Sequence, residues 1–296
     1  MAGACSYMPV ESGGLVKKCC IAGLGLIGCS LGLALGKHGL ALERWGYDIA
    51  PQARKEAEAR GAVDKTAPLA QALDGAELII LAAPVGLIPG LLAEAAPFLA
   101  EGALVTDVGS SKRAIVEAAH KVLPPGTPFI GGHPMAGSEQ PGIGRAHPDL
   151  FQEAAYFLTL ESLVPEDGLE LMKKIIHRIG AYPVTITPAE HDRLMAPLSH
   201  LPQLIATALV NTLAGYSRAD STIPSLAGRG FKDSTRIAAG APYLWQDILI
   251  SNRDNLLDCL DLFMQEIERL RGYLKQGDKE GLSSSLVKAA SLRRTL

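Results

Sequence analysis

The stretch Ile21-Ala22-Gly23-Leu24-Gly25-Leu26-Ile27-Gly28 decides the fold, because three spaced glycines close an apolar run and open a helical pattern. Gly23 permits a tight turn, Gly25 lets the backbone approach a pyrophosphate, and Gly28 lets helix and strand pack closely. The helix that begins there directs free N–H groups and its positive dipole end at the phosphates. A glycine-rich turn that binds nothing is the alternative. The predicted dinucleotide site consists of Gly23, Leu24, Gly25, Leu26, Ile27 and Gly28.

An acidic residue lies where such a unit holds the adenosine ribose of its cofactor. Asp48 follows Gly28 by twenty residues and ends the second predicted strand. A carboxylate about 4 Å from a 2′-phosphate costs on the order of 4 kcal/mol at an effective dielectric constant near 20. Neither Arg44 nor Arg54 is obviously placed to offset that repulsion. We therefore predict NAD rather than NADP as the cofactor, with Asp48 on its ribose hydroxyls.

Short apolar runs alternate with longer helical patterns from residue 17 to residue 187, which is typical of a parallel sheet with crossover helices. We predict a Rossmann-type α/β domain at 17–187, preceded by a flexible leader at 1–16. The loop that contains Ala83 and Pro84 is expected to run along the cofactor at the carboxyl edge of the sheet. The predicted strands are Lys18–Ala22, Arg44–Asp48, Glu77–Ala82, Ala103–Asp107, Pro128–Ile130, Ala155–Leu160 and Tyr182–Ile186, and the intervening helices include Gly25–His38, Pro51–Arg60, Gly86–Phe98, Lys112–Lys121 and Glu166–Ile179.

The pattern changes after Pro188, where helical periodicity continues without a convincing strand. We predict an all-α substrate and dimerisation domain at 188–296. Its last predicted helix carries apolar residues at spacings of 4, 3, 4, 3 and 4, a seam suited to packing against another helix. That partner helix could belong to the same domain or to a second subunit. The helices are predicted at Ala189–Leu213, near Gly230–Ala239, at Ala241–Asn252 and at Arg253–Gln276, and the seam consists of Leu256, Leu260, Phe263, Ile267, Leu270 and Leu274.

The composition is that of a globular protein, with 296 residues, 48% hydrophobic and 20% charged residues, and a formal net charge of −3. No run of Lys or Arg indicates nucleic-acid binding, and no signal peptide or apolar run of roughly 18 residues indicates secretion or a membrane span. The five cysteines form no C-x-x-C pair and no metal-ligand cluster, so we expect reduced thiols, a cytoplasmic location and no metal.

Two polar loops are expected at the carboxyl edge of the sheet, beside the nicotinamide. Ser110 follows the strand that ends at Asp107, and His133 stands in a glycine- and proline-rich loop after Ile130. A histidine in that position is a candidate general base near neutral pH, and a packing role is the alternative.

The second half of the chain contributes two further polar clusters. His191 and Ser199 share one face of a predicted helix, and His200 follows directly. Lys232 and Arg236 lie one turn apart on another helix, where Arg236 could bind a carboxylate with two hydrogen bonds. The alternative for this second cluster is a solvated face in which Asp233 pairs with a neighbouring cation.

Together these motifs resemble the prephenate dehydrogenase family, which comprises prephenate, arogenate and cyclohexadienyl dehydrogenases. The likeness covers nearly the whole chain after residue 17. Many dehydrogenases share the glycine motif, whereas the histidine–proline loop and the Phe-Lys-Asp-Ser-Thr-Arg stretch are far more specific. The motifs are Gly23-Leu-Gly25-Leu-Ile-Gly28, Asp107-Val-Gly-Ser110-Ser-Lys112, Gly131-Gly-His133-Pro-Met-Ala-Gly-Ser-Glu139, Ser199-His200-Leu-Pro202 and Gly230-Phe-Lys232-Asp233-Ser-Thr-Arg236.

The resemblance implies NAD-dependent oxidative decarboxylation of prephenate to 4-hydroxyphenylpyruvate, on the route to tyrosine. It implies that His133 accepts the proton of the ring hydroxyl and that Ser110 hydrogen-bonds the same hydroxyl or the histidine. It further implies a homodimer through the helical domain. The remaining implied substrate-binding residues are Arg236 on the side-chain carboxylate, Lys232 and Asp233 as its orienting partners, His191, Ser199 and His200 as pocket residues, and Trp245 from the partner subunit.

One position departs from the pattern of some family members, in which a histidine follows the Ser-His-Leu-Pro stretch. Here that residue is Gln203, which leaves arogenate, or both compounds, as alternative substrates. A 3-hydroxyacid or 6-phosphogluconate type of dehydrogenase shares the two-domain plan but uses a catalytic lysine in its helical half. A non-catalytic NAD-binding protein would explain the glycine motif alone, not the convergence of His133, Ser110 and Arg236.

Overall fold

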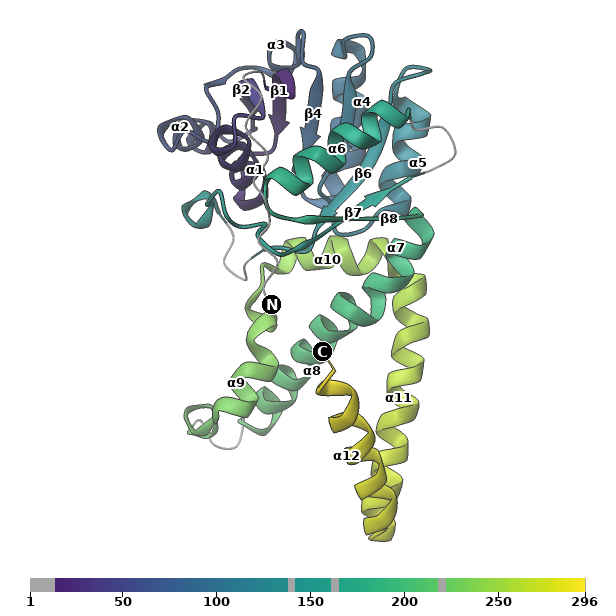
Figure 1. Cartoon of the computed structure of the whole chain (residues 1–296). Coiled ribbons are helices and arrows are strands. Elements are labelled where there is room, and N and C mark those ends of the chain that lie inside the picture. Colours follow the sequence, from purple (N-terminus) through teal and green to yellow (C-terminus); the bar gives the residue numbers. More distant parts are fainter. Residues whose placement is uncertain (1–13, 138–141, 161–164, 218–221, 296) are drawn as a thin grey trace, which may run out of the picture.

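A sheet flanked by helices forms the first part of the protein and a group of long helices forms the second (Figure 1). The computed structural model describes residues 14–137, 142–160, 165–217 and 222–295. The strands are β1 (Val16–Ala22), β2 (Ala41–Tyr47), β3 (Lys65–Thr66), β4 (Leu78–Leu81), β5 (Leu104–Asp107), β6 (Phe129–Pro134), β7 (Ala155–Thr159) and β8 (Tyr182–Ile186).

The strand order is β3-β2-β1-β4-β5-β6-β7-β8, and all pairs from β3 to β6 are parallel. The chain order therefore reverses between β1 and β4, which is the switch point at which ligands bind in open α/β sheets. This arrangement confirms the predicted Rossmann-type architecture. The short strand β3 was not among the predicted elements.

The far edge of the sheet corrects two predictions. β7 runs antiparallel to β6, with His133 opposite Phe157, and β8 runs parallel to β7. A parallel neighbour would need a long crossover, usually a helix, and the described part of the β6–β7 connection holds only the short turn η3 (Ile143–Arg145). Because the antiparallel pairing extends β6 as far as Pro134, His133 lies in the strand and not in a loop after Ile130.

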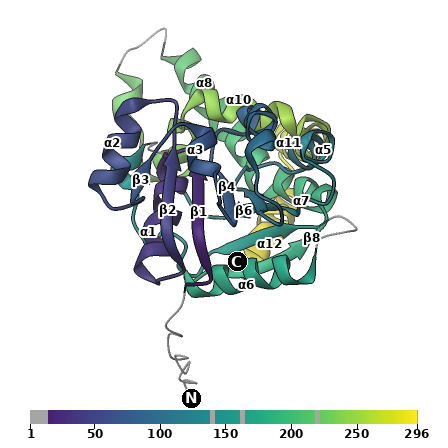
Figure 2. The ribbon, with the colours of Figure 1, turned by 90° about the horizontal axis from the view of Figure 1, so that it is seen from above.

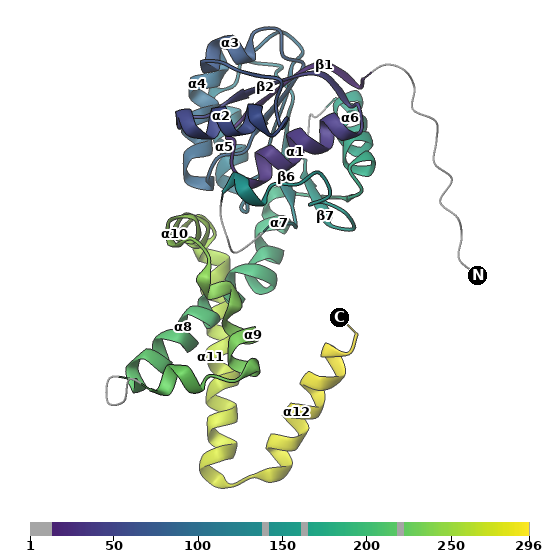
Figure 3. The ribbon, with the colours of Figure 1, turned by 90° about the vertical axis from the view of Figure 1, so that its left-hand side faces the viewer.

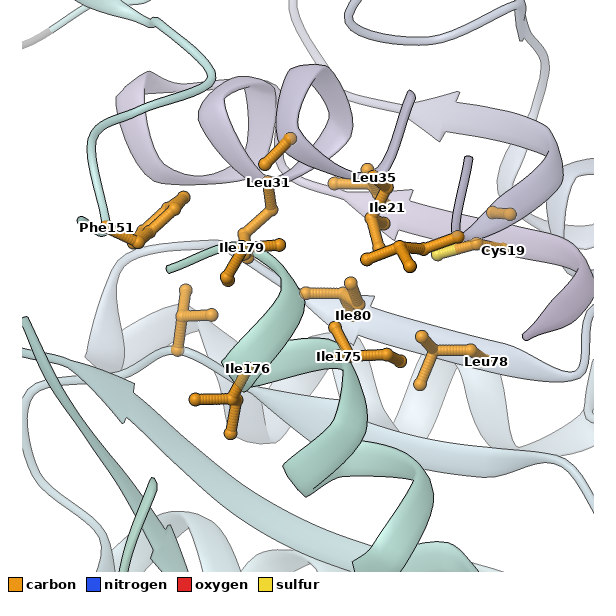
Figure 4. Packing of buried hydrophobic residues seen from close by; sticks show 14 of the residues in the cluster. Cys19, Ile21, Leu31, Leu35, Leu78, Ile80, Phe151, Ile175, Ile176 and Ile179 are labelled. Carbon is orange, nitrogen blue, oxygen red and sulfur yellow. The ribbon is translucent and has the colours of Figure 1, made fainter. Parts of the chain in front are cut away.

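Helices cover both faces of the sheet (Figure 2). In Figure 4, Leu31 and Leu35 of the first helix pack with Ile175 and Ile176 of α6 over the strand residue Ile80. The other face buries a second, separate hydrophobic cluster. The first face is covered by α1 (Leu26–Lys37), α2 (Pro51–Ala59) and α6 (Glu166–Arg178), and the second by α3 (Leu69–Leu73), α4 (Ile88–Ala95) and α5 (Arg113–Val122). The short turns η1 (Val85–Leu87) and η2 (Ala96–Phe98) precede and follow α4.

The helical part begins directly at the end of the sheet, because only Thr187 separates β8 from α7. Thr187 and Glu190 form a capping box, in which Glu190 N–H donates to Thr187 Oγ1 at 3.2 Å and Thr187 N–H donates to Glu190 Oε2 at 2.9 Å. The helices are α7 (Pro188–Met195), the π-helical turn η4 (Ala196–His200), α8 (Leu201–Tyr216), η5 (Ile223–Leu226), α9 (Arg229–Thr235), η6 (Arg236–Ala239), α10 (Pro242–Ser251), α11 (Arg253–Gln276) and α12 (Lys279–Arg293).

Two features of this part differ from the predicted helices. The helix expected at Ala189–Leu213 contains the π-helical turn, and Pro202 cannot donate the backbone hydrogen bond that a regular helix needs there. α12 was not predicted, because its sequence lacks a clear apolar stripe. In Figure 3, α11 extends away from the sheet and α12 turns back toward it, so that the two helices form the arms of a V.

The apolar seam of α11 is only partly covered within one chain. Leu256 is 7% exposed, whereas Ile267 and Leu274 are 41% and 68% exposed. The seam is therefore best covered at the start of α11, beside the rest of the chain, and least covered at its far end (Figure 3).

Three further observations concern the described ranges. No helix there is long and apolar enough to cross a membrane. The four described cysteines, Cys19, Cys20, Cys29 and Cys259, are free. No group of three or more His, Cys, Asp or Glu side chains in those ranges is arranged to hold a metal ion.

Candidate active site

The fold gathers the predicted polar segments at one edge of the sheet. The parallel strands β1, β4, β5 and β6 all end there, and α7 and α10 lie against the same edge (Figure 1). The glycine loop follows β1, the Ala83-Pro84 loop follows β4, and Ser110 follows β5. Residues that are far apart in the sequence therefore meet because parallel strands share a carboxyl edge.

The glycine loop has the geometry that a dinucleotide needs. Gly23 has a φ of +106°, and a Cβ there would lie 2.5 Å from the backbone of Ala82. A Cβ on Gly28 would lie 2.0 Å from the carbonyl oxygen of Gly23, so helix and strand can meet only at a glycine. A Cβ on Gly25 would have no heavy atom within 4 Å, which leaves this face of the loop open. The first turn of α1 contains no acidic residue, so its N–H groups and dipole are available to a pyrophosphate.

Asp48 lies beside this loop at the end of β2. Its Oδ2 accepts from Leu24 N–H and its Oδ1 accepts from Ala50 N–H, both at 2.8 Å. Arg54 Nη1 donates to the Asp48 carbonyl oxygen at 3.0 Å. Arg44 instead bonds to Asp64 and to the carbonyl oxygens of Gly32 and Gly61, so its charge is engaged away from Asp48. The hydrogen bonds from Leu24 and Ala50 hold the Asp48 carboxylate at the mouth of the glycine loop.

His133 is the centre of the second group. Its side chain is buried, with 8% exposed, and its Nδ1 lies 2.8 Å from Nε2 of His191 on α7. The ring of Phe157 makes an edge contact with His191 at 5.4 Å between centroids and excludes water from one side of the pair. Burial, followed by the nearby His191, Lys112 and His200, holds the pKa of His133 well below its ordinary value of 6.5. The His133 imidazole is therefore neutral at pH 7 and able to accept a proton.

His191 connects His133 to a carboxylate. Nδ1 of His191 lies 2.8 Å from Oδ1 of Asp192, and neither side chain is more than 1% exposed. Asp192 also accepts from the backbone N–H groups of Lys112 at 2.7 Å and Arg113 at 3.0 Å. Burial lowers the pKa of His191 below its ordinary value. Asp192 was not among the predicted site residues.

A buried ion pair fixes the backbone on the other side of His133. Lys112 and Asp107 are both fully buried and form an ion pair. Lys112 Nζ also donates to the Gly132 carbonyl oxygen at 2.7 Å, and Asp107 accepts from the N–H groups of Gly109 at 2.7 Å and Gly132 at 3.2 Å. The pair thus ties the segment after β5 to the residue that precedes His133.

The π-helical turn brings two more predicted residues to this region. Ser199 is half-buried and His200 is fully buried. Asn252, between α10 and α11, donates to the Asp192 carbonyl oxygen at 2.7 Å and lies 3.0 Å from Nδ1 of His200. Burial lowers the pKa of His200 to about 4. Ser110 is half-buried at the start of the segment that carries the ion pair, and π-helical turns are frequent at functional sites.

The other predicted residues lie apart from this buried group in a single chain. Lys232, Asp233 and Arg236 are exposed on α9 and η6, which lie further from the sheet than α7 (Figures 1 and 3). Trp245, on α10, packs against Gly240 of its own chain. Ser138 and Glu139, the last residues of the quoted histidine–proline motif, lie outside the described residues.

Comparison with known proteins bears on both halves of the chain. Residues 31–185 match the family model described as "Prephenate dehydrogenase, nucleotide-binding domain", and residues 187–288 match "Prephenate dehydrogenase, dimerization domain". The chain belongs to the prephenate dehydrogenase family. The boundary between the two matches coincides with Thr187-Pro188, where the sheet ends and α7 begins.

Individual relatives agree with this assignment. The chain is 36% identical over 264 residues to a prephenate dehydrogenase of Bacillus subtilis, with 88% of this chain and 71% of that protein covered. The structure of Aquifex aeolicus prephenate dehydrogenase with hydroxyphenyl propionate and NAD+ has a TM-score of 0.88 and 30% identity, and covers 94% of this chain and 97% of that one. An arogenate dehydrogenase from Synechocystis has a TM-score of 0.80 and 32% identity, with 94% and 99% covered. The chain is an NAD-dependent dehydrogenase of this family.

Proposed function

We propose that this prephenate dehydrogenase family member converts prephenate to 4-hydroxyphenylpyruvate with NAD as the oxidant. The observation that carries the proposal is the neutral, buried His133 at the sheet edge where the glycine loop also lies. A hydride leaves a carbinol carbon readily only when the hydroxyl proton is removed, so a neutral base beside the cofactor site is the group that the reaction requires.

The glycine loop and Asp48 fit the cofactor, since the loop leaves open space at Gly25 and free N–H groups at the start of α1. When bound, NAD supplies the hydride acceptor. His133 takes the proton from the 4-hydroxyl of the ring as the C4 hydrogen departs with its electron pair. Loss of the ring carboxylate as CO2 then makes the ring aromatic, and the protonated His133 returns its proton to the phenolate oxygen. Ser110 is proposed to hold the hydroxyl in line with His133.

Prephenate carries two carboxylates, and the helical half supplies the cations and polar groups for them. We assign Arg236 to the side-chain carboxylate, since its planar guanidinium can donate two parallel hydrogen bonds. The other substrate-binding residues that we propose are Lys232, Asp233, Ser199 and His200, with Trp245 contributed by a partner subunit. Both ring nitrogens of His191 face His133 and Asp192, so we propose that it borders the pocket by positioning His133 and does not bind the substrate itself.

A second copy of the chain is the proposed cover for the exposed apolar positions of α8, α11 and α12. Supporting this, the matched second family model is described as a dimerization domain. Large hydrophobic side chains that are at least 41% exposed, such as Leu262, Ile267 and Leu274 on α11, offer the surface such a dimer would bury. We also propose a cytoplasmic location, in keeping with the free thiols of the four described cysteines.

Arogenate is the second candidate substrate, and one observation favours it. Gln203 is 4% exposed, and its Oε1 has no hydrogen-bond donor among the described residues. A buried amide oxygen without a donor is costly. The ammonium group of arogenate is a donor, whereas the keto group that replaces it in prephenate is not.

The deciding experiment measures initial rates of NADH formation by the purified protein with NAD and either prephenate or arogenate. Turnover of prephenate supports the proposal, turnover of arogenate alone favours the second candidate, and the ratio of the two specificity constants names the preferred substrate. Binding of NAD without turnover of either compound would contradict it. A Gln203→His variant, compared with the wild type, reports whether this position sets the ratio.

A further inference from the structure

We propose that Asp192 acts through His191 to hold His133 in the tautomer that carries its proton on Nδ1, so that Nε2 is the proton acceptor. Asp192 and His191 are therefore positioning residues, and His133 is the group that touches the substrate. This inference rests on the proposed role of His133 as the general base. It assigns a function to Asp192 that neither the motifs nor the family likeness indicated.

The direction of each hydrogen bond follows from the chemistry of the donors, beginning at Asp192. Its Oδ1 accepts from Lys112 N–H and its Oδ2 accepts from Arg113 N–H, at 2.7 and 3.0 Å. A carboxylate has only acceptors, so the third contact, at 2.8 Å, must be a donation from Nδ1–H of His191.

A neutral imidazole has one N–H donor and one acceptor nitrogen. With its proton on Nδ1, His191 presents an acceptor at Nε2, which lies 2.8 Å from Nδ1 of His133. His133 must therefore donate from Nδ1, and the lone pair of its own Nε2 is left to accept the substrate proton. The pKa of each ring lies below its ordinary value because of burial, so both rings are neutral and the chain of donors has one direction.

The surroundings hold Asp192 in place as an acceptor. The two N–H groups that it accepts from lie at the start of α5, where the positive end of the helix dipole favours a carboxylate. On the other side, Asn252 donates to the Asp192 backbone carbonyl oxygen at 2.7 Å and so connects it to the α10–α11 junction. Asp192 is 1% exposed, so solvent does not compete for its oxygens.

An Asp192→Asn variant is the first test. With its oxygen in the Oδ2 position the amide still accepts from Arg113 N–H, and its nitrogen, in the Oδ1 position, donates to Nδ1 of His191 and reverses every bond up to His133. The opposite orientation would preserve the bonds, and ¹⁵N NMR of the variant shows which tautomer His133 adopts. Reversal of the corresponding tautomer in a serine protease costs about 10⁴-fold in kcat. We expect kcat to fall by about 100-fold or more, while KM and NAD affinity change by less than about threefold. An unchanged kcat in a variant whose His133 shows the reversed tautomer would overturn the proposal, as would a loss of kcat matched by equal losses of substrate and NAD affinity.

A pair of variants at His191 provides the matched control. In His191→Gln the amide can accept from His133 and donate to Asp192, which preserves the direction of the chain, whereas His191→Leu cannot bond to either. We expect the Gln variant to keep kcat within about tenfold of the wild type and the Leu variant to resemble Asp192→Asn. Equal losses in the two variants would contradict the relay.

Nitrogen NMR of the unaltered protein, labelled with ¹⁵N in histidine, tests the tautomer without relying on activity. The His133 signals are assigned as those missing from a His133→Gln variant. The proposal predicts protonated Nδ1 and unprotonated Nε2 for His133, and the reverse assignment would overturn it. Because this readout needs no substrate, absence of turnover on prephenate and arogenate would refute the proposed function while the tautomer remained measurable.

Discussion

The two halves of the chain bury their apolar residues very differently. Among the described residues, only four of the buried hydrophobic side chains follow Pro188, namely Met195, Ala196, Ala206 and Leu256. By contrast, fifteen of the 22 large hydrophobic side chains that are exposed lie after Pro188. The sheet domain completes its own core on both faces, whereas the helical half leaves its apolar surface open in a single chain.

This difference indicates which parts of the proposed active site each half of the chain provides. The glycine loop and the buried ion pair around His133 depend on a self-sufficient sheet domain, so the cofactor site and the base are set within one chain. The substrate-binding residues proposed on α9 and α10 lie in the half whose surface lacks a cover. The site is therefore expected to be complete only when a second copy packs against the helices.

The largest effect is expected from substitutions that prevent a second copy from packing against the helices. In an Ile267→Glu, Leu274→Glu double variant, two charges would be placed on the open seam of α11, where both side chains are largely exposed in the single chain. We expect complete conversion to a species of 31.2 kDa in sedimentation, with loss of turnover but retained NAD binding. Leu42→Glu, on the sheet domain at a site about as exposed as Leu274, is the control and should leave the oligomeric state of the wild type unchanged. A double variant that stays dimeric would refute the seam as the interface.

Replacement of the base should affect turnover rather than binding. His133→Asn removes the proton acceptor, and loss of a general base typically costs on the order of 10²–10⁴-fold in kcat. NAD affinity, measured by titration, should be unchanged because the glycine loop is separate from His133. A change confined to KM would show that His133 binds substrate and does not accept the proton.

Acid should destabilise the junction between the halves, where His200 is buried. Burial lowers the pKa of His200 from 6.5 to about 4, so above pH 6.5 the ring is neutral in both the folded and the unfolded chain. As pH falls from 6.5 to about 4, only the unfolded chain takes up the proton, and the free energy of unfolding falls by about 1.4 kcal/mol per pH unit, roughly 3 kcal/mol in all.

Urea unfolding at a fixed protein concentration, repeated at several pH values, measures this slope. In a His200→Gln variant, the free energy of unfolding should change less steeply with pH between pH 6 and pH 4.5. The difference in slope should be about 1.4 kcal/mol per pH unit, which corresponds to one proton. An identical slope in the two proteins would mean that His200 is protonated in the folded state.

A smaller effect is expected at the substrate clamp in the helical half. Arg236→Ala should weaken substrate binding by about 2 kcal/mol, or roughly 30-fold in KM, which is the low end for truncating one member of a charged pair because Arg236 is exposed in the single chain. Arg229→Ala, at an exposed position on the adjoining helix α9, should leave KM unchanged. Equal effects of the two substitutions would indicate general electrostatic attraction instead of a specific clamp.

Much of the sheet domain was predictable because its signals are local. The glycine spacing, Asp48 and the alternation of apolar runs each reflect a requirement of the neighbouring backbone, and the strands and helices were found close to their predicted positions. The direction of β7 was not predictable, because its short, mostly apolar sequence fits a parallel and an antiparallel neighbour equally well. α12 was missed because its sequence lacks a clear apolar stripe.

The candidate site was predictable where a motif marks it and hidden where only the tertiary structure does. His133, His191 and His200 were chosen from sequence and lie together. Asp192 and Asn252 were missed because their roles depend on contacts across 80 and 60 positions, with Lys112 and with each other. The one available signal was the acid that directly follows His191 at the start of a capped helix.

The most direct test of the account follows the transferred hydrogen. Purified protein is given NAD and prephenate that carries deuterium at C4, and the reduced cofactor and the CO2 released are quantified by mass spectrometry. The account predicts one deuterium in each reduced cofactor and one CO2 for each 4-hydroxyphenylpyruvate formed. Reduced cofactor without deuterium, or reduction without CO2, would contradict the proposed reaction.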